Sequence, residues 1–275
     1  MKPVNFDYAR PIDVEESLSL LAEDGRLVKV LAGSQSLGPM LNMRLVQPDL
    51  LVDITGIEEL RQVKEEAGGV VIGACITHSD IEDGRVPDVT GGALPKVAHG
   101  IAYRAVRNRG TIGGSLTHAD PSADWISILA ALGASVTLRG PNGARTIPVE
   151  DYMLGALEAD LRPGELLISV TAPRLSQSAR WGYYKICRKT GEFAHAIGAF
   201  VIDPERGICR AVIGATETRP IVIADARAII ADGDPRHFDG RAADMAARSA
   251  GMKDPLDRQT HVVALRRAVE RAAAR

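Results

Sequence analysis

The order of apolar and polar residues predicts alternating helices and strands in the first part of the chain. Asp13 and Glu16 have the spacing of a variant capping box, so a helix is expected from there to about Ala22. Helical spacing recurs at 37–44, 94–107 and 124–132, and Thr77 stands where another helix would begin. Short apolar runs predict buried strands at 27–32, 50–54, 70–74, 134–138 and 165–170.

The pattern changes after Pro173. Residues 175–180 are small and polar, which favours a linker. Strand-like runs follow at 181–188, 196–202 and 208–215, and helical stretches near 222–230, 241–249 and 259–274 close the chain. Strands followed by helices predict a small α+β domain at 175–275, after a first domain at 1–174.

Composition narrows the class of protein. A length of 275 residues suits about two domains, and a net charge of −2 argues against a nucleic-acid surface. The sequence contains no secretory h-region and no apolar run long enough to span a membrane, so a cytoplasmic protein is expected.

The cysteines and histidines predict no metal site in this chain. The chain has an odd number of widely spaced cysteines, Cys75, Cys187 and Cys209, and no Cys-x-x-Cys pair occurs. The histidines have no ligand spacing either. Any redox metal would therefore belong to partner chains.

Two turns rich in small residues are the candidate binding features. Residues 32–36 stand between an expected strand and helix, and residues 111–115 between a helix and a strand-like run. Small residues let the backbone approach a ligand, and successive amides with serine and threonine hydroxyls can bind phosphate oxygens. Neither turn has a known mononucleotide pattern, and either one alone is more often structural. The two together favour the diphosphate of a dinucleotide.

The longer segments around these turns carry a family resemblance. Leu31-Ala32-Gly33-Ser34-Gln35-Ser36-Leu37 with Asn42-Met43-Arg44-Leu45, and 101–115 with His118-Ala119-Asp120-Pro121-Ser122-Ala123-Asp124, resemble the two FAD loops of molybdenum hydroxylase flavin subunits. That family includes the flavin subunits or domains of aerobic carbon monoxide dehydrogenase, nicotine dehydrogenase and xanthine dehydrogenase. One departure is Ser34, where the family usually has glycine; serine would be strained there if the position needs a positive φ.

The resemblance implies an α+β fold. Its first part is a two-lobed FAD-binding domain of the vanillyl-alcohol-oxidase/CO-dehydrogenase-flavoprotein type, with lobes at about 1–55 and 56–174. Its second part, 175–275, is a small C-terminal domain with a three-stranded antiparallel sheet and a helical bundle.

The resemblance also implies FAD-binding residues. Asp124 would accept hydrogen bonds from an FAD hydroxyl or the adenine side, Thr77 would add a hydroxyl, and Ile101 would lie near the isoalloxazine. Leu167 would meet the ring edge through its backbone, Lys185 would stand near the pyrimidine end, and Phe193 would cover the ring. The diphosphate would be held from one side by Val30, Leu31, Ala32, Gly33, Ser34, Gln35, Ser36 and Leu37, and from the other by Thr111, Gly113, Gly114 and Ser115.

Several of these residues have a simpler interpretation. Asp124 could be the N-cap of the following helix, and Ile101 fits the apolar face of its helix. Lys185 could lie on a solvated strand face, and Phe193 could belong to the core. These alternatives stay open at the level of sequence.

In function, the resemblance implies an oxidoreductase subunit without catalytic or metal residues of its own. A large subunit would hold the molybdenum cofactor and a small one two [2Fe–2S] clusters, in a dimer of heterotrimers, and FAD would pass electrons to an external acceptor. The alternatives are a self-sufficient FAD-dependent oxidoreductase and a non-catalytic assembly module that has lost its flavin site. The sequence names neither the hydroxylated substrate nor the acceptor, which could be NAD, oxygen, a quinone or a cytochrome.

Overall fold

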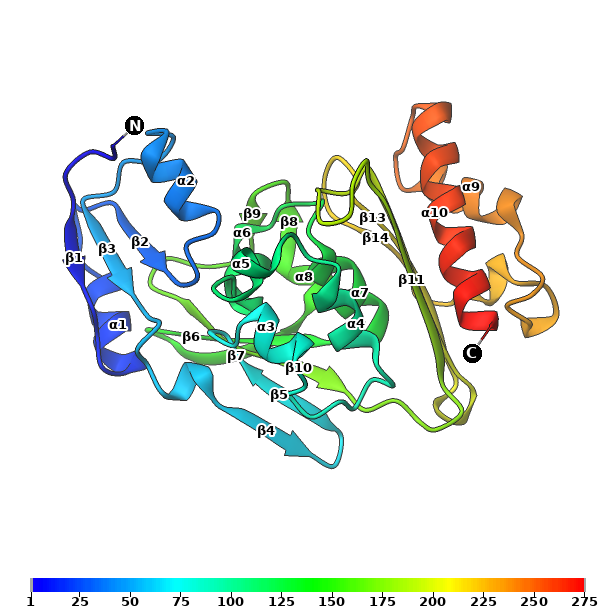
Figure 1. Cartoon of the computed structure of the whole chain (residues 1–275), viewed down its shortest axis with the longest axis horizontal. Helices are drawn as coiled ribbons and strands as arrows, with labels where there is room; N and C mark the ends of the chain where they lie inside the picture. Colours follow the sequence, from blue (N-terminus) through cyan, green and yellow to red (C-terminus); the bar gives the residue numbers. More distant parts are fainter. Residues whose placement is uncertain (1, 275) are drawn as a thin grey trace.

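The computed structural model describes residues 2–274 and arranges them as three sheet-containing regions in a row (Figure 1). The N-terminal region has a parallel three-stranded sheet of order β1-β3-β2. Its elements are β1 (Asp7–Ala9), α1 (Val14–Leu21), β2 (Val28–Leu31), α2 (Leu37–Asn42) and β3 (Leu50–Asp53). Every residue of the central strand β3 is buried, as expected for a continuous apolar run. Asp13 caps α1 by accepting from the amide of Glu16, which confirms that helix start.

The middle region is built on an antiparallel five-stranded sheet of order β4-β5-β10-β6-β7. The strands are β4 (Val63–Glu66), β5 (Gly69–Gly73), β6 (Ser135–Gly140), β7 (Gly143–Pro148) and β10 (Leu166–Pro173), with η1 (Glu59–Arg61) before β4 and a small hairpin of β8 (Met153–Gly155) and β9 (Glu158–Ala159). Its helices are α3 (His78–Glu82), α4 (Ala93–His99), α5 (Arg104–Arg107), α6 (Ile112–His118), α7 (Asp124–Leu132) and α8 (Val149–Tyr152).

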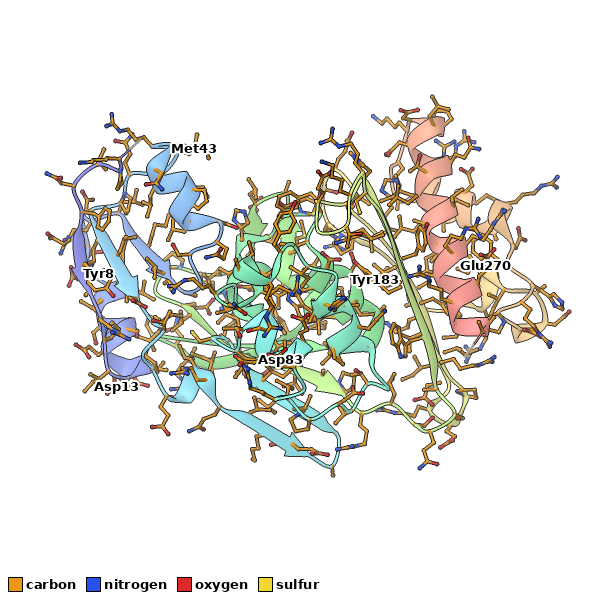
Figure 2. The ribbon with its side chains drawn as sticks, in the orientation of Figure 1. Tyr8, Asp13, Met43, Asp83, Tyr183 and Glu270 are labelled. Carbon is orange, nitrogen blue, oxygen red and sulfur yellow. The ribbon has the colours of Figure 1, made fainter. Side chains whose placement is uncertain are left out.

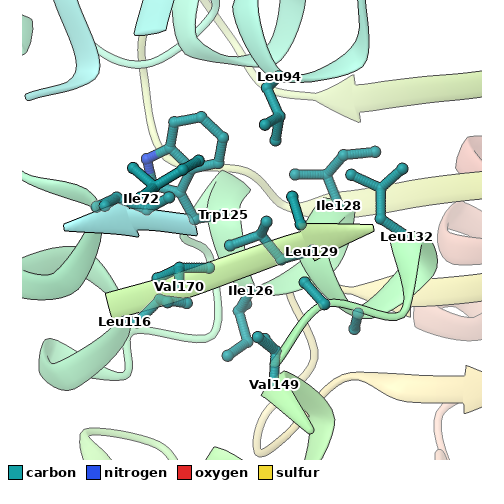
Figure 3. Close-up of a cluster of buried hydrophobic side chains, with 14 of the residues drawn as sticks. Ile72, Leu94, Leu116, Trp125, Ile126, Ile128, Leu129, Leu132, Val149 and Val170 are labelled. Atoms are coloured by element: carbon teal, nitrogen blue, oxygen red, sulfur yellow. The ribbon is translucent and has the colours of Figure 1, made fainter. Parts of the chain in front are cut away.

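The core of the middle region forms around α7. All nine residues of this helix are buried, because it lies between the five-stranded sheet and the C-terminal sheet. Trp125 packs among Ile72, Leu94 and Val170 in the cluster shown in Figure 3. Burial of every residue is expected of a mostly apolar helix that is covered on both sides.

The C-terminal region is an antiparallel four-stranded sheet covered by two helices on its outer face (Figure 1). Along β12, Ala199 and Val201 face α7, whereas Phe200 and Ile202 face the helices, which is the alternation of a strand buried on both sides. The elements are β11 (Arg180–Ile186), β12 (Ala196–Asp203), η2 (Pro204–Arg206), β13 (Ile208–Gly214), β14 (Ile221–Ile223), η3 (Ala226–Ile229), η4 (Ala231–Gly233), α9 (Gly240–Ser249) and α10 (Pro255–Ala273).

Three expected elements are wrong. The helix near 222–230 is the short strand β14 followed by η3; β14 pairs with Ala211–Ile213 and makes the expected three-stranded sheet four-stranded. Its β-branched residues favour a strand when an edge is available. The helix at 94–107 is broken at 100–103, and the strand-like run after the second turn is helix α6, whose buried Ile112 and Leu116 stand four residues apart. None of the helices described between residues 2 and 274 is long and apolar enough to cross a membrane.

Candidate functional site

The two turns rich in small residues, at 32–36 and 111–115, are distant in sequence but lie in contact. Gly33 packs so tightly against the second segment that an added Cβ would lie 2.1 Å from the carbonyl oxygen of Arg109 and 2.7 Å from the Cα of Gly110. A Cβ on Gly114 would lie 3.7 Å from the Cβ of Ala32. The first turn, at the end of β2, is therefore seated on the second turn, which opens α6.

The first turn presents unused hydrogen-bond donors. Within residues 2–274, the backbone amides of 33–36 and the hydroxyls of Ser34 and Ser36 donate to no acceptor in the chain. Ser34 has φ +60, so serine occupies the left-handed conformation that the glycine usual in the family would adopt without strain. The side chain of Gln35 donates back to the carbonyl of Gly33 at 2.9 Å and ties the turn together. A run of free amides is the donor set that a phosphate group needs.

The second turn uses most of its amides to build the fold. The amides of Ile112 and Gly113 donate to the carbonyls of Ile76 and Ala74, each at 3.0 Å, and the amide of Gly114 donates to the Thr111 hydroxyl at 3.1 Å. The expectation of several ligand-binding amides at 111–115 is therefore wrong for these three. For Ile112 and Gly113 the cause is tertiary, because the chain from 74 to 78 runs alongside the turn, whereas Thr111 caps the amide of Gly114 locally. The exposed Gly114 and the hydroxyl of Ser115 remain free to face a ligand.

Thr77 and His78 support the second turn from below. Thr77 forms an isolated bridge with Thr111, and its hydroxyl donates to the Asp80 carboxylate at 2.6 Å in a capping box. The amide of His78 donates to the carbonyl of Gly110 at 2.9 Å. The His78 ring is buried, and its Nδ1 accepts from Nε1 of Trp125 at 3.0 Å. Burial lowers the pKa of His78 to about 4, so the ring is neutral at pH 7.

A buried ion pair joins the middle and C-terminal regions. Lys185 of β11 donates to the Asp124 carboxylate of α7 and to the carbonyl of Gly100, both at 3.0 Å. Tyr183 donates to Asp124 at 2.6 Å; Figure 2 shows Tyr183 on the C-terminal sheet at its border with the middle region. Burial raises the pKa of Asp124 against the opposing effect of Lys185, and it raises the pKa of Tyr183, to which Asp124 adds. The helix N-cap is Ala123, and the Lys185 side chain is 10% exposed, so both simpler interpretations are wrong.

The turn at 100–102 faces the loop that carries Phe193. Gly191 has φ +88, and a Cβ there would lie 2.6 Å from the carbonyl oxygen of Ala102. Phe193 is 71% exposed, so it is not a core residue. Ile101 is half-buried and packs on the edge of the middle core, but it stands in the break between α4 and α5 and not on the face of a helix.

Leu167 is a core residue that is linked to the second turn. It is buried in the core on β10, beside an irregularity in the pairing with β6. The carbonyl of its neighbour Ile168 accepts from the amide of Ala74, and the carbonyl of Ala74 accepts from Gly113. Leu167 is thus linked through the sheet to the second turn.

The sequence comparison identifies the family of this arrangement. Residues 4–175 match the family described as the FAD binding domain in molybdopterin dehydrogenase. The chain belongs to that family.

Relatives and solved structures agree with this assignment. The chain is 35% identical to the carbon monoxide dehydrogenase medium chain of Afipia carboxidovorans over 100% of this chain and 99% of that one. It is 35% identical to the 6-hydroxypseudooxynicotine dehydrogenase complex subunit alpha of Paenarthrobacter nicotinovorans, over 90% and 85% of the two chains. The structure of reconstituted CO dehydrogenase from Oligotropha carboxidovorans superimposes with a TM-score of 0.90 at 31% identity and full coverage of both chains.

The donor set of the first turn fits the FAD of this family. The amides of 33–36 are unpaired within the described chain, and Gly33 lets two backbones approach more closely than a side chain would allow. A separate open hollow of about 540 Å³, lined by His237, Phe238 and Arg266 among others, lies in the C-terminal region and contains none of the candidate residues.

Sequence reasoning missed three residues that organise the site. Tyr183 contacts Asp124, and Arg107 with Glu82 braces the turn at 100–102. Tyr183 follows the alternation of a strand, and Arg107 follows the helical spacing of 94–107, so neither differs from its surroundings in the sequence.

Proposed function

We propose that this chain is the electron-transferring FAD subunit of a heteromeric molybdenum hydroxylase. The observation that carries the proposal is the first turn, whose free amides at 33–36 are seated against the second turn. When bound, FAD supplies the exchange between one-electron and two-electron transfer. The chain's own residues supply binding, orientation and the electrostatic surroundings of the ring.

Each group of residues has a part in holding FAD. The amides of Gly33, Ser34, Gln35 and Ser36 would bind the diphosphate, with Val30, Leu31, Ala32 and Leu37 shaping their strand-to-helix turn. From the opposite side the contacts would come from Thr111, Gly114 and Ser115, with Gly113 and Thr77 fixing that turn in place. Ile101, Asp124, Leu167, Lys185 and Phe193 would surround the flavin.

Lys185 has the most specific electrostatic task. Two of its three N–H donors are used, by Asp124 and by the carbonyl of Gly100. The third would donate to the pyrimidine end of the flavin, where a cation favours the reduced, negatively charged form. Because Asp124 holds the ammonium in place, it would set this interaction even without touching the flavin.

The partners follow from the kind of protein to which the chain is similar. Several relatives are named as medium chains or as one subunit of a dehydrogenase complex. We infer a small subunit with two [2Fe–2S] clusters and a large subunit with the molybdenum cofactor, in a dimer of heterotrimers. Electrons would pass from the clusters to FAD and on to an external acceptor.

Among residues 2–274, no three His, Cys, Asp or Glu side chains gather as metal ligands, which supports placing the clusters in a partner. Three free cysteines suit a reducing compartment such as the cytoplasm.

The test is a visible absorption spectrum of the purified chain, alone and assembled with its two neighbouring subunits. The expected result is a flavin spectrum with resolved bands, no substrate turnover by the chain alone, and bleaching of the flavin when substrate is added to the assembled complex. Sustained turnover by the isolated chain would favour the self-sufficient oxidoreductase. An assembled complex that retains no FAD once unbound FAD has been removed would favour the assembly module.

A further inference from the structure

The turn at 100–102 is held by two cations. Three successive carbonyl groups point at positive charges: that of Gly100 accepts from Lys185 at 3.0 Å, and those of Ile101 and Ala102 accept from one nitrogen of Arg107 at 2.9 and 3.1 Å. An acceptor that loses its donor away from water costs free energy, and hydrogen bonds from charged donors are stronger than neutral ones, so these cations stabilise the backbone shape of the turn. The turn is where the expected helix at 94–107 breaks.

The backbone of this turn is strained. Ala102 has φ +41, outside the conformations that alanine favours. From the other side, the backbone of Gly191 lies so close that an added Cβ would be 2.6 Å from the Ala102 carbonyl oxygen. Strain of this kind persists only where neighbouring contacts enforce it. The contacts that enforce it here are those of Arg107 and of the Gly191 backbone.

Arg107 is fixed in turn by Glu82. Its Nε and the nitrogen not used by the turn donate to the two carboxylate oxygens of Glu82 at 2.7 and 3.0 Å, the forked geometry of a strong ion pair. The side chains of Arg107 and Glu82 are 9% and 11% exposed. The hydrogen bonds from Arg107 lower the pKa of Glu82, so the pair is charged at pH 7.

Arg104 offers a natural contrast on the same helix, α5. It also pairs with Glu82, at 3.0 Å, and with Asp83, which Figure 2 shows near the centre of the molecule. Its side chain is 47% exposed and donates to none of the carbonyls at 100–102. Arg104 therefore shares the ion pair of Arg107 but not its contact with the turn.

We propose that Arg107, oriented by Glu82, is a positioning residue for the flavin. By holding the carbonyls of Ile101 and Ala102, it keeps the turn in its strained shape. That shape places Ile101 and, through Gly191, the loop of Phe193 on the flavin side. We call the contact of Arg107 with the carbonyls of Ile101 and Ala102 the clamp. The clamp is a property of the chain itself, and the inference rests on the proposed function only in saying that the turn faces the flavin.

The test compares Arg107→Met with Arg104→Met in the full-length chain. Arg107→Met is expected to weaken FAD binding about tenfold, to blur the visible flavin bands and to shift the reduction potential, because two half-buried carbonyls lose a charge-assisted donor. Arg104→Met is expected to leave all three unchanged. Equal behaviour of the two variants would overturn the proposal.

A second substitution separates positioning from general support of the fold. Glycine adopts a positive φ without strain, so adding Ala102→Gly to Arg107→Met is expected to restore much of the affinity and of the band structure. If the double variant behaves like Arg107→Met alone, Arg107 serves stability only and the proposal fails. Should Arg107→Met not fold, Glu82→Gln is expected to give a smaller change in the same direction, and no change there would equally contradict the proposal.

Hydrogen exchange keeps this inference distinct from the proposed function. The amide of Ile101 donates to the carbonyl of Ala98 at 3.0 Å, so its exchange reports on the turn without any flavin. In the flavin-free chain, Arg107→Met is expected to speed this exchange about tenfold, and Arg104→Met to leave it unchanged. Unchanged exchange in Arg107→Met would overturn the clamp, whereas a wild-type chain that ignores FAD would instead count against the proposed function.

Discussion

The two turns rich in small residues are similar in composition, but their backbone amides are used differently. At 33–36 the backbone amides have no acceptor within the described chain, so they remain available to a ligand. At 112–114 the amides are consumed by the carbonyls of Ala74 and Ile76 and by the Thr111 hydroxyl. Glycine at Gly33 and Gly113 is required for the same reason, a close approach of another backbone. The comparison teaches that small residues mark close packing, and only the hydrogen bonds decide which turn can bind a ligand.

The largest effect is expected from Gly33→Ala. The new methyl group would lie 2.1 Å from the carbonyl oxygen of Arg109, so the two turns must separate. We expect FAD affinity to fall at least about 100-fold and stability by about 3 kcal/mol, as for overpacking against a backbone. Isothermal titration and urea unfolding would measure both. Gly68→Ala is the matched control, since no atom lies within 4 Å of its Cβ position; a similar loss there would rule out the steric account.

Gly113→Ala is expected to reduce stability more than FAD affinity, in contrast to Gly33→Ala. Its methyl group would lie 2.6 Å from the Cβ of Ala74 and 2.8 Å from the Ala74 carbonyl oxygen, inside the core and away from the free amides. We expect a loss of about 2 kcal/mol in the free energy of unfolding. FAD affinity should fall less than in Gly33→Ala, as measured by the same titration. A greater loss of affinity than in Gly33→Ala would mean that the second turn is the principal binding element.

The support beneath the second turn should depend on pH. In the folded chain the pKa of His78 is lowered from 6.5 to about 4. Between these two pH values the unfolded chain therefore binds a proton at His78 and the folded chain does not. Its contribution to stability is therefore complete above pH 6.5 and declines by about 1.4 kcal/mol per pH unit as the pH falls to 4. His78→Gln keeps an acceptor for Trp125 and should flatten this slope in urea unfolding between pH 7 and 4.5. Identical slopes in the two proteins would contradict the buried, neutral histidine.

The smallest effect is expected from Ser34→Gly. Glycine relieves the strain of φ +60 at the price of a more flexible unfolded chain, so stability should rise by about 0.5 kcal/mol. The amides stay in place, and FAD affinity should remain within about threefold of wild type. A larger loss of affinity would show that the Ser34 hydroxyl, rather than the backbone, carries the binding.

Periodicity and local chemistry predicted much of the fold and located both turns. Thr77 as a helix N-cap and α7 as an apolar helix follow from residues adjacent in sequence, and the structure confirms them. The fate of the amides of Ile112 and Gly113 did not follow, because it depends on a segment more than 30 residues earlier. The role of Arg107 was missed for the same reason: Glu82 stands 25 residues before it. Strand β14 was missed because its apolar run also fits a helix.

The most direct measurement is a titration of the flavin-free chain with FAD and, separately, with riboflavin, followed by flavin fluorescence. We expect FAD to bind at least about 100-fold more tightly than riboflavin, since only FAD carries the diphosphate that the free amides at 33–36 would hold. We also expect Gly33→Ala to remove most of this difference. Equal affinity for FAD and riboflavin, in the chain alone and in the assembled complex, would contradict the assignment of the first turn as the diphosphate site.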